Sequence, residues 1–286
     1  METLRARLSR KPIVVAPGVY DAFTALVATQ AGFATLYVSG AAIAYTKLAR
    51  PDIGLTGMSE VAETITLIRD RVGAQLIVDA DTGYGNALNV VRTVRVFERA
   101  GASAIQLEDQ DFPKRCGHLD GKVLIPADEM VGKIKAALDT RVSSETLVIA
   151  RTDAVAVEGF GRAIERAGRY REAGADVLFV EAPKTREELA RVAQALPGIP
   201  LLANMVEGGK TPPLAAAELE ALGFALVIFP GGIVRALGRM AADYYASLAT
   251  NGTTEPFRNQ MLDFEGLNRV IGTPEMIALG KHYEGA

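Results

Sequence analysis

The chain is poor in residues that mark several protein classes: its 286 residues include one cysteine, Cys116, and two histidines, His118 and His282. A single cysteine cannot form an intramolecular disulfide, which favours a reducing, cytoplasmic location. One cysteine and two histidines are also too few ligands for a typical structural zinc site. With so few cysteines and histidines, a metal site in this chain is expected to use oxygen ligands.

Long apolar runs and an excess of positive charge are also missing. No apolar run approaches the roughly 20 residues that a membrane helix needs, and the charged N-terminal segment lacks the pattern of a secretion signal. Lys and Arg number 31 against 34 Asp and Glu, so the basic face typical of nucleic-acid-binding proteins is not expected. We expect a cytoplasmic protein whose partners are neither membranes nor nucleic acids.

Short apolar segments alternate with helix-length amphipathic segments along most of the chain. The apolar segments are nearly continuous, which is typical of parallel strands buried on both faces. The expected strands are residues 13–16, 36–39, 76–79, 104–108, 147–151, 177–181, 201–204 and 225–229. The expected helices are residues 58–72, 87–100, 127–138, 161–173, 186–196 and 213–222. Gly32, Gly101, Gly174 and Gly223 stand between a helix and the next strand, where they predict left-handed helix caps.

Eight such units predict an α/β fold, a (β/α)8 TIM-type barrel, with an open doubly wound sheet as the alternative. We place the catalytic barrel at residues 1–250 and a C-terminal helical extension at residues 251–286. Polar residues at the ends of different strands favour the closed barrel, because its strand ends converge on one mouth. These residues are Ser39, Asp79, Asp81, Glu108, Asp109, Arg151, Asp153, Glu181 and Asn204.

An acidic cluster is the first candidate for chemistry. Asp79 and Asp81 are two residues apart, so in extended chain both side chains face the same side. With Asp52 and Glu108 they form a set of oxygen ligands that would suit Mg²⁺ or Mn²⁺. The alternative is that these acids cap helices or pair with arginine.

A glycine-punctuated polar loop, Lys114-Arg-Cys-Gly-His, is the second candidate. The loop is expected to be exposed, and its cations to lower the pKa of the Cys116 thiol, so that the thiol exchanges a proton near neutral pH. The alternative is a small buried apolar cysteine. Arg151, which follows the fifth strand, is suited to binding a carboxylate with two hydrogen bonds, with a structural Arg–Glu pair as the alternative.

Four motifs together resemble the isocitrate lyase/phosphoenolpyruvate mutase superfamily: Asp79-Ala-Asp-Thr-Gly-Tyr-Gly, Glu108-Asp-Gln, Lys114-Arg-Cys-Gly-His and Ala150-Arg-Thr-Asp. The cysteine loop is similar to that of the lyase branch, which includes dimethylmalate lyases, methylisocitrate lyases and the petal death protein. The resemblance implies a barrel whose last helix is exchanged between subunits of a homotetramer. It also implies a Mg²⁺-dependent carbon–carbon lyase, with Mn²⁺ as the alternative metal.

The resemblance also assigns residues. The metal ligands would be Asp79 and Asp81, with Asp52 and Glu108 acting through water. The catalytic residues would be Cys116 as general acid, Tyr37 as acceptor of the hydroxyl proton, Arg151, Lys114 and His118. The substrate-binding residues would be Ser39, Gly40, Ala41, Gly117, Arg151, Glu181, Asn204 and Arg235.

Departures from the methylisocitrate lyase pattern narrow the expected substrate. Val206 replaces a threonine, and Phe264 aligns with a substrate-binding arginine, so a dicarboxylate fits better than a tricarboxylate. The expected reaction cleaves a 2-hydroxy dicarboxylate such as 2,3-dimethylmalate, or the tricarboxylate 2-methylisocitrate, into an α-keto acid and a carboxylate. The alternatives are an oxaloacetate hydrolase or decarboxylase on the same scaffold and a non-catalytic metabolite-binding barrel.

Overall fold

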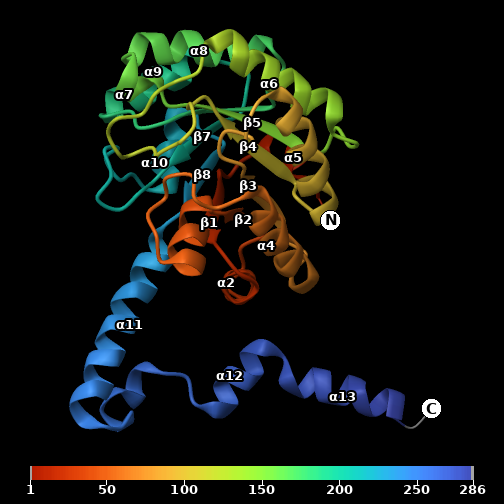
Figure 1. Cartoon of the computed structure of the whole chain (residues 1–286), viewed down its shortest axis with the longest axis vertical. Coiled ribbons are helices and arrows are strands. Elements are labelled where there is room, and N and C mark those ends of the chain that lie inside the picture. Colours follow the sequence, from red (N-terminus) through yellow and green to blue (C-terminus); the bar gives the residue numbers. More distant parts are fainter. Residues whose placement is uncertain (1, 285–286) are drawn as a thin grey trace. The chain divides into compact units, whose positions relative to one another are not determined.

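Eight parallel strands close into a barrel in the order β1 to β8, and β1 pairs with β8 through Val14 and Leu226 (Figure 1). The structure is a computed structural model that describes residues 2–284. The strands are β1 (Val14–Val19), β2 (Thr35–Val38), β3 (Gln75–Asp79), β4 (Ala104–Glu108), β5 (Leu147–Thr152), β6 (Val177–Val180), β7 (Leu201–Asn204) and β8 (Leu226–Phe229). The predicted TIM-type barrel is confirmed, and the open-sheet alternative is wrong.

Helices separate the strands and surround the barrel in Figure 1. They are α1 (Leu4–Leu8), α2 (Ala22–Gln30), α3 (Gly40–Ile43), the π-helix η1 (Ala44–Leu48), α4 (Met58–Arg71), α5 (Ala87–Ala100), α6 (Ala127–Thr140), α7 (Ala154–Val157), α8 (Phe160–Glu172), α9 (Arg186–Ala195) and α10 (Ala216–Leu222). The predicted left-handed turns are present, since Gly32, Gly101, Gly174 and Gly223 all have φ between 96° and 108°.

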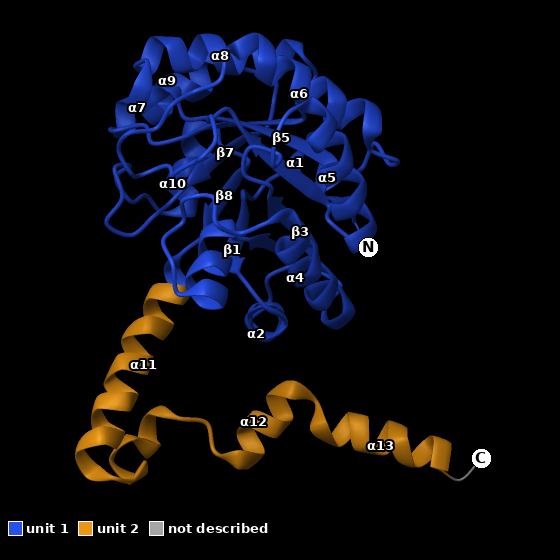
Figure 2. Cartoon of the chain, in the orientation of Figure 1, with its two compact units in different colours: residues 1–233 blue, residues 234–286 orange. Residues whose placement is uncertain are grey.

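The chain divides into two compact units, residues 1–233 and residues 234–286 (Figure 2). Helix α11 (Gly232–Asn251) begins at the end of the first unit, and η2 (Glu255–Gln260), α12 (Phe264–Ile271) and α13 (Thr273–Glu284) follow it. The sequence analysis placed the boundary at the end of α11, whereas the units separate at its beginning. None of the helices within residues 2–284 combines the length and apolar character of a membrane span.

The barrel interior is filled by alternate residues of the strands. Ile77, Ile149 and Phe179 belong to one buried cluster, together with Leu4 and Leu8 of α1. The cluster also contains Val14, Leu147 and Leu226, which begin their strands, so α1 closes the amino-terminal end of the barrel. The carboxyl ends of the strands are left to form the opposite, polar mouth.

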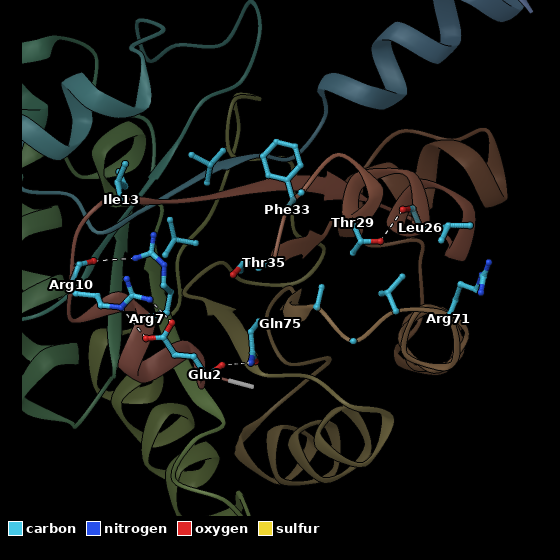
Figure 3. Close-up of a pocket in the computed structure, with 17 residues that line it drawn as sticks. Glu2, Arg7, Arg10, Ile13, Leu26, Thr29, Phe33, Thr35, Arg71 and Gln75 are labelled. Atoms are coloured by element: carbon cyan, nitrogen blue, oxygen red, sulfur yellow. Dashed lines mark hydrogen bonds and ion pairs between the residues drawn. The ribbon is translucent and has the colours of Figure 1, made fainter. Parts of the chain in front are cut away.

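A cavity of about 760 Å³ lies at the amino-terminal ends of β1, β2 and β3 (Figure 3). Two of its arginines have partners nearby: Arg10 donates to Glu2 at 2.9 Å, and Arg7 donates to the Pro12 carbonyl at 2.6 Å. The acidic residues of the mouth follow the other ends of these strands. The cavity is therefore separate from the candidate active site.

Candidate active site

The two-residue repeat of the strands positions the polar side chains of the mouth. Ile77 faces the barrel interior, so Asp79, two residues further, faces the same side. The same step leads from Ile149 to Arg151 and from Phe179 to Glu181. It also leads from Tyr37 to Ser39 and from Leu202 to Asn204. The closed barrel thus brings together side chains at the carboxyl ends of five strands.

Lys114 joins two of the predicted metal ligands. Its ammonium group contacts the carboxylate of Asp52 and lies 2.6 Å from Asp81 Oδ1. All three side chains are at least nine-tenths buried, so the positive charge of Lys114 partly neutralises two carboxylates that are removed from water. Lys114 was predicted as a catalytic residue, and the structure places it within the acidic cluster.

Asp79 is held by neighbours from β4, from the segment after β3 and from α3. Gln106 Nε2 and the Asp81 backbone N–H both donate to Asp79 Oδ1, each at 3.2 Å. A side chain on Gly40 would place its Cβ 3.2 Å from Asp79 Oδ2, so glycine lets α3 approach the carboxylate. Gln106 was missed by the sequence analysis, although it lies two residues before Glu108 and faces the same side.

Tyr37 donates a hydrogen bond of 3.0 Å to Gln106 Oε1. Burial and the negative charge of Asp79 raise the pKa of Tyr37 well above its usual value, so its phenol is protonated at neutral pH. This state supports a hydrogen-bonding role more than the predicted role of accepting the substrate's hydroxyl proton, which remains a prediction.

The carboxylate oxygens of the acidic cluster are suitable ligands for a hard divalent cation. Asp81 Oδ1 and Glu108 Oε1 are buried and have no well-aligned hydrogen-bond donor, although Lys114 lies close to the first. Burial raises the pKa of Asp81 to about 7, and it raises that of Glu108 as well. Excess buried negative charge on oxygen ligands is what Mg²⁺ or Mn²⁺ would neutralise. Within residues 2–284 no three acidic, histidine or cysteine side chains already converge as a metal cluster.

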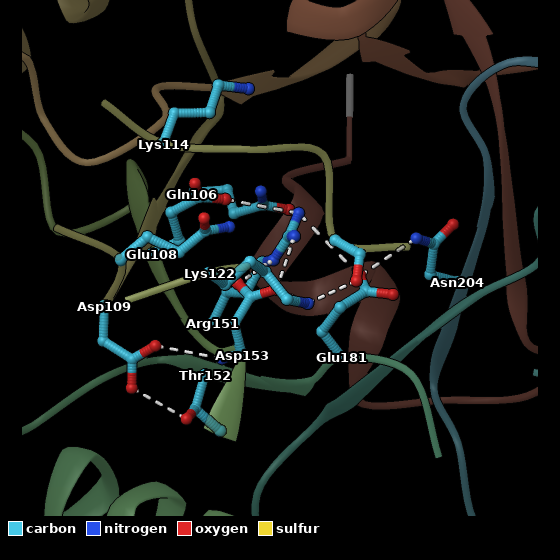
Figure 4. A network of polar contacts seen from close by, with 12 residues as sticks. Gln106, Glu108, Asp109, Lys114, Lys122, Arg151, Thr152, Asp153, Glu181 and Asn204 are labelled. Atoms are coloured by element: carbon cyan, nitrogen blue, oxygen red, sulfur yellow. Dashed lines mark hydrogen bonds and ion pairs between the residues drawn. The ribbon is translucent and has the colours of Figure 1, made fainter. Parts of the chain in front are cut away.

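Arg151 lies at the centre of a buried network (Figure 4). It donates from Nε to Asp153 Oδ2 at 2.9 Å and from Nη2 to Asp153 Oδ1 at 3.0 Å. Its Nη1 lies 3.3 Å from Glu108 and 3.8 Å from Glu181. The guanidinium is thus fixed on one side by Asp153, and its Nη1 faces the other two carboxylates.

The cysteine loop differs from the expectation of an exposed loop. The Cys116 side chain is partly buried, and its backbone N–H donates to the Asp52 carbonyl at 3.1 Å. Burial raises the pKa of the Cys116 thiol, while the His118 backbone N–H acts in the opposite direction. The expected lowering by neighbouring cations is therefore wrong, because Lys114 is directed to Asp52 and Asp81. A thiol that keeps its proton at neutral pH is nevertheless suited to act as a general acid.

Gly117 and His118 connect this loop to the strands beneath it. A Cβ on Gly117 would lie 2.4 Å from Arg151 Nη2, so only glycine allows such an approach. His118 Nδ1 accepts a 3.0 Å hydrogen bond from the Lys210 backbone N–H, and Nε2 lies 3.2 Å from Glu181 Oε1, without the alignment of a hydrogen bond. Burial lowers the pKa of His118, which favours the neutral ring with its proton on Nε2.

Comparison with known proteins agrees with this geometry. The family model described as phosphoenolpyruvate phosphomutase matches residues 4–249. The chain belongs to the phosphoenolpyruvate mutase/isocitrate lyase superfamily. It is 44% identical over 280 residues to 2,3-dimethylmalate lyase of Eubacterium barkeri, covering 98% of this chain and 96% of that protein. It is 47% identical over 258 residues to 2-methylisocitrate lyase of Aeropyrum pernix, covering 90% of this chain and 82% of that protein.

Solved structures of the superfamily superpose over nearly the whole chain. A crystal structure of 2,3-dimethylmalate lyase has a TM-score of 0.91 at 37% identity and covers 99% of this chain and 96% of its own. Oxaloacetate acetylhydrolase with 3,3-difluorooxalacetate has a TM-score of 0.92 at 34% identity and covers 99% and 97%. Phosphonopyruvate hydrolase with oxalate and Mg²⁺ has a TM-score of 0.88 at 32% identity and covers 98% and 97%.

The predicted substrate-binding residues of α3 and α11 lie at two different places in the fold. Ser39 Oγ accepts from the Ala42 backbone N–H at 3.2 Å, so Gly40 and Ala41 occupy the first turn of α3, where helices leave donors without intrahelical acceptors. Arg235 lies on α11 in the second unit. Substrate binding by these residues remains a prediction.

Asp109 does not belong to the mouth, although the sequence analysis grouped it there. It follows Glu108 by one residue, so its side chain faces the surrounding helices. Its carboxylate accepts hydrogen bonds of 2.7 Å from both Thr152 Oγ1 and Tyr170 OH, and 2.9 Å from the Asp153 N–H. Asp109 is fully buried and joins β4 to β5 and α8.

Replacing Asp109 with alanine is expected to lower the free energy of unfolding by about 3 kcal/mol or more, because several buried donors lose their acceptor. The thermal midpoint should fall by roughly 6 °C. Thermal unfolding followed by circular dichroism measures the change. Asp128→Ala is the matched control, since Asp128 is 87% exposed in its pair with Arg169. Equal midpoints for the two variants would contradict this account of Asp109.

Proposed function

We propose that the protein is a divalent-metal-dependent carbon–carbon lyase of the oxo-acid-lyase type that cleaves a 2-hydroxy dicarboxylate between C2 and C3. The products are an α-keto acid of the pyruvate type and a carboxylate. The observation that carries the proposal is the position of Cys116, a partly buried thiol on a loop that contacts both Asp52 and the Arg151–Glu181 region. Two relatives named as lyases support it.

The proposed reaction balances without an external oxidant or reductant. The hydroxyl proton passes to solvent water before the loop closes, C2 becomes the keto carbon, and the electron pair of the C2–C3 bond moves to C3. Cys116 then donates the Sγ proton to C3, and the thiolate recovers a proton from solvent when the loop opens for the next turnover. The loop excludes water while the carbanion exists, because water would otherwise compete as the proton donor.

The metal-binding residues in this proposal are Asp79 and Asp81, with Asp52 and Glu108 acting through water. A bound Mg²⁺, or alternatively Mn²⁺, would stabilise the negative charge that develops on the substrate oxygen. The buried carboxylate oxygens without aligned donors support this assignment, as does the Mg²⁺ complex of phosphonopyruvate hydrolase.

The proposed substrate is a dicarboxylate rather than a tricarboxylate. Arg151 would bind one carboxylate through the Nη1 group that faces the mouth, and Asn204 is oriented by its 3.0 Å hydrogen bond to Glu181. Val206 offers no hydroxyl donor beside Asn204. These features favour 2,3-dimethylmalate over 2-methylisocitrate.

Arg151 also provides a test of substrate binding. Arg151→Lys is expected to reduce kcat/KM by about 30-fold or more, equivalent to about 2 kcal/mol, because one ammonium group cannot both replace the two contacts with Asp153 and present a donor to the substrate. Steady-state kinetics measure the loss, and Arg162→Lys is the control, since Arg162 forms an exposed pair with Glu165. A change of less than about twofold would show that Arg151 does not act on the substrate.

The second candidate function is hydrolysis or decarboxylation of oxaloacetate. The structural similarity to oxaloacetate acetylhydrolase supports this second candidate. Against hydrolysis, Pro230-Gly-Gly follows β8 where hydrolases of this superfamily carry a hydroxyl residue. A non-catalytic barrel fits less well, because Asp79, Asp81, Arg151 and Cys116 are all present.

A substrate screen distinguishes these functions. One preparation with Mg²⁺ is incubated with 2,3-dimethylmalate, 2-methylisocitrate or oxaloacetate, and the α-keto acid and carboxylate products are quantified. We expect kcat/KM for 2,3-dimethylmalate to exceed that for 2-methylisocitrate by about tenfold or more. Conversion of oxaloacetate to oxalate and acetate, without cleavage of either hydroxy acid, would contradict the lyase proposal.

The proposed assembly is a cytoplasmic homotetramer with exchanged C-terminal helices. Its support is the exposure of apolar side chains in the second unit, including Leu262, Phe264 and Ile277. Such side chains are usually covered by a partner. Light scattering of the full chain should give four times the 30.4 kDa subunit mass.

A further inference from the structure

Lys122 is a buried lysine that the proposed chemistry does not use. It lies just after the cysteine loop, and its side chain is 1% exposed. The ammonium group donates to the Gly117 carbonyl and, at 2.8 Å, to Asp153 Oδ1. Since Gly117 lies between Cys116 and His118, Lys122 connects the loop that carries the thiol to the residue after β5.

The position of Asp153 is fixed by its surroundings. It is fully buried, and its backbone N–H donates to Asp109. The same carboxylate accepts the two hydrogen bonds from Arg151 that fix the guanidinium. One carboxylate therefore holds the cysteine loop through Lys122 and the guanidinium directly.

The cysteine loop packs so closely against Arg151 that it cannot move towards the guanidinium. The Gly117 backbone is so close to Arg151 that no Cβ would fit. A shift of the loop would therefore change the distance between the Cys116 thiol and the substrate position at Arg151. Misplacement of about 1 Å is enough to slow a positioned reaction strongly.

We propose that Lys122 and Asp153 are positioning residues that hold the Cys116 loop closed against Arg151. The pair does not touch the reacting atoms. It fixes the Gly117 carbonyl, and so determines where the neighbouring thiol lies. This inference rests on the proposed function for its catalytic consequence, but the loop position can be measured without any substrate.

The test uses the fact that Cys116 is the only cysteine of the chain. Alkylation of the full-length protein by iodoacetamide, followed by intact mass, therefore reports access to this loop alone. Lys122→Met removes the cation at nearly the same length, and we expect the alkylation rate to rise about tenfold or more because the loop opens more often. The kcat for the lyase substrate should fall by about tenfold or more, with a smaller change in KM.

Lys210→Met is the matched control. Lys210 also bonds to the segment that follows the cysteine loop, at 2.6 Å from Asp120 Oδ1, but the Asp120 side chain is 93% exposed. An exposed pair contributes little, so both rates should change less than about twofold. Lys122→Arg, which keeps the buried charge, should restore part of the protection from alkylation.

Circular dichroism of each variant confirms that the fold is intact. If Lys122→Met does not fold, Lys122→Gln, whose amide can still donate one hydrogen bond, is used in its place. Folded Lys122 variants with wild-type alkylation and kcat would overturn the inference. Faster alkylation of Lys122→Met, when the unmodified protein itself cleaves none of the hydroxy acids, would instead support the positioning role and contradict the proposed function.

Discussion

Replacing Cys116 with alanine is expected to reduce carbon–carbon cleavage by about a hundredfold or more, the usual contribution of a general acid. The thiol is the proposed donor to C3, and its burial keeps it protonated at neutral pH. Substrate and metal binding should survive, because Asp79, Asp81 and Arg151 belong to other loops and strands. Single-turnover kinetics and equilibrium binding on the same variant separate the two effects.

Cys116→Ser is the companion variant. A serine hydroxyl has nearly the same size but is a much weaker acid than a thiol, so it should restore little activity. Failure of the loop to close would also lower the rate, and protection from protease in the presence of an inhibitor distinguishes that cause. If Cys116→Ala closes normally and turns over near the wild-type rate, the thiol is not the acid.

Removal of the metal is expected to have the largest effect. Excess chelator should lower cleavage by about a thousandfold or more, since a metal ion supplies several kcal/mol of charge stabilisation. Mg²⁺ or Mn²⁺ should restore it. Asp79→Ala should lose activity that added metal does not restore, because this carboxylate is the best-oriented member of the set.

Asp70→Ala is the control for the acidic set, since Asp70 is an acidic residue at the end of α4, away from the mouth. Its activity and metal response should match those of the unmodified protein. Calorimetry with Mg²⁺ provides a second measurement that does not depend on turnover. Full activity in excess chelator would contradict the metal assignment.

The barrel could be predicted from the sequence because its signals are local. Continuous apolar segments marked each buried strand, and β4 and β7 begin and end where expected. The four glycine turns were also predictable, since a left-handed cap favours glycine wherever it occurs. Convergence of the polar residues then followed from closure of the barrel.

Other features depend on contacts between distant segments. The sequence placed cations beside Cys116, but Lys114 is directed to Asp52 and Asp81, so the expected effect on the thiol pKa was wrong. Gln106 lies in β4 and faces inward, whereas Asp109 follows the last residue of β4 and faces outward. That alternation was available in the sequence and would have identified Gln106 and excluded Asp109. The connection from Lys122 to Asp153 could not be predicted, since 31 residues separate them.

Cleavage of 2,3-dimethylmalate in D₂O tests the central claim most directly. The lyase reaction with Mg²⁺ should give equal amounts of pyruvate and propionate, and NMR should show one deuterium on the propionate carbon that was C3. Cys116→Ala should form both products at least about a hundredfold more slowly. Absence of pyruvate and propionate, with oxaloacetate instead converted to oxalate and acetate, would contradict the account.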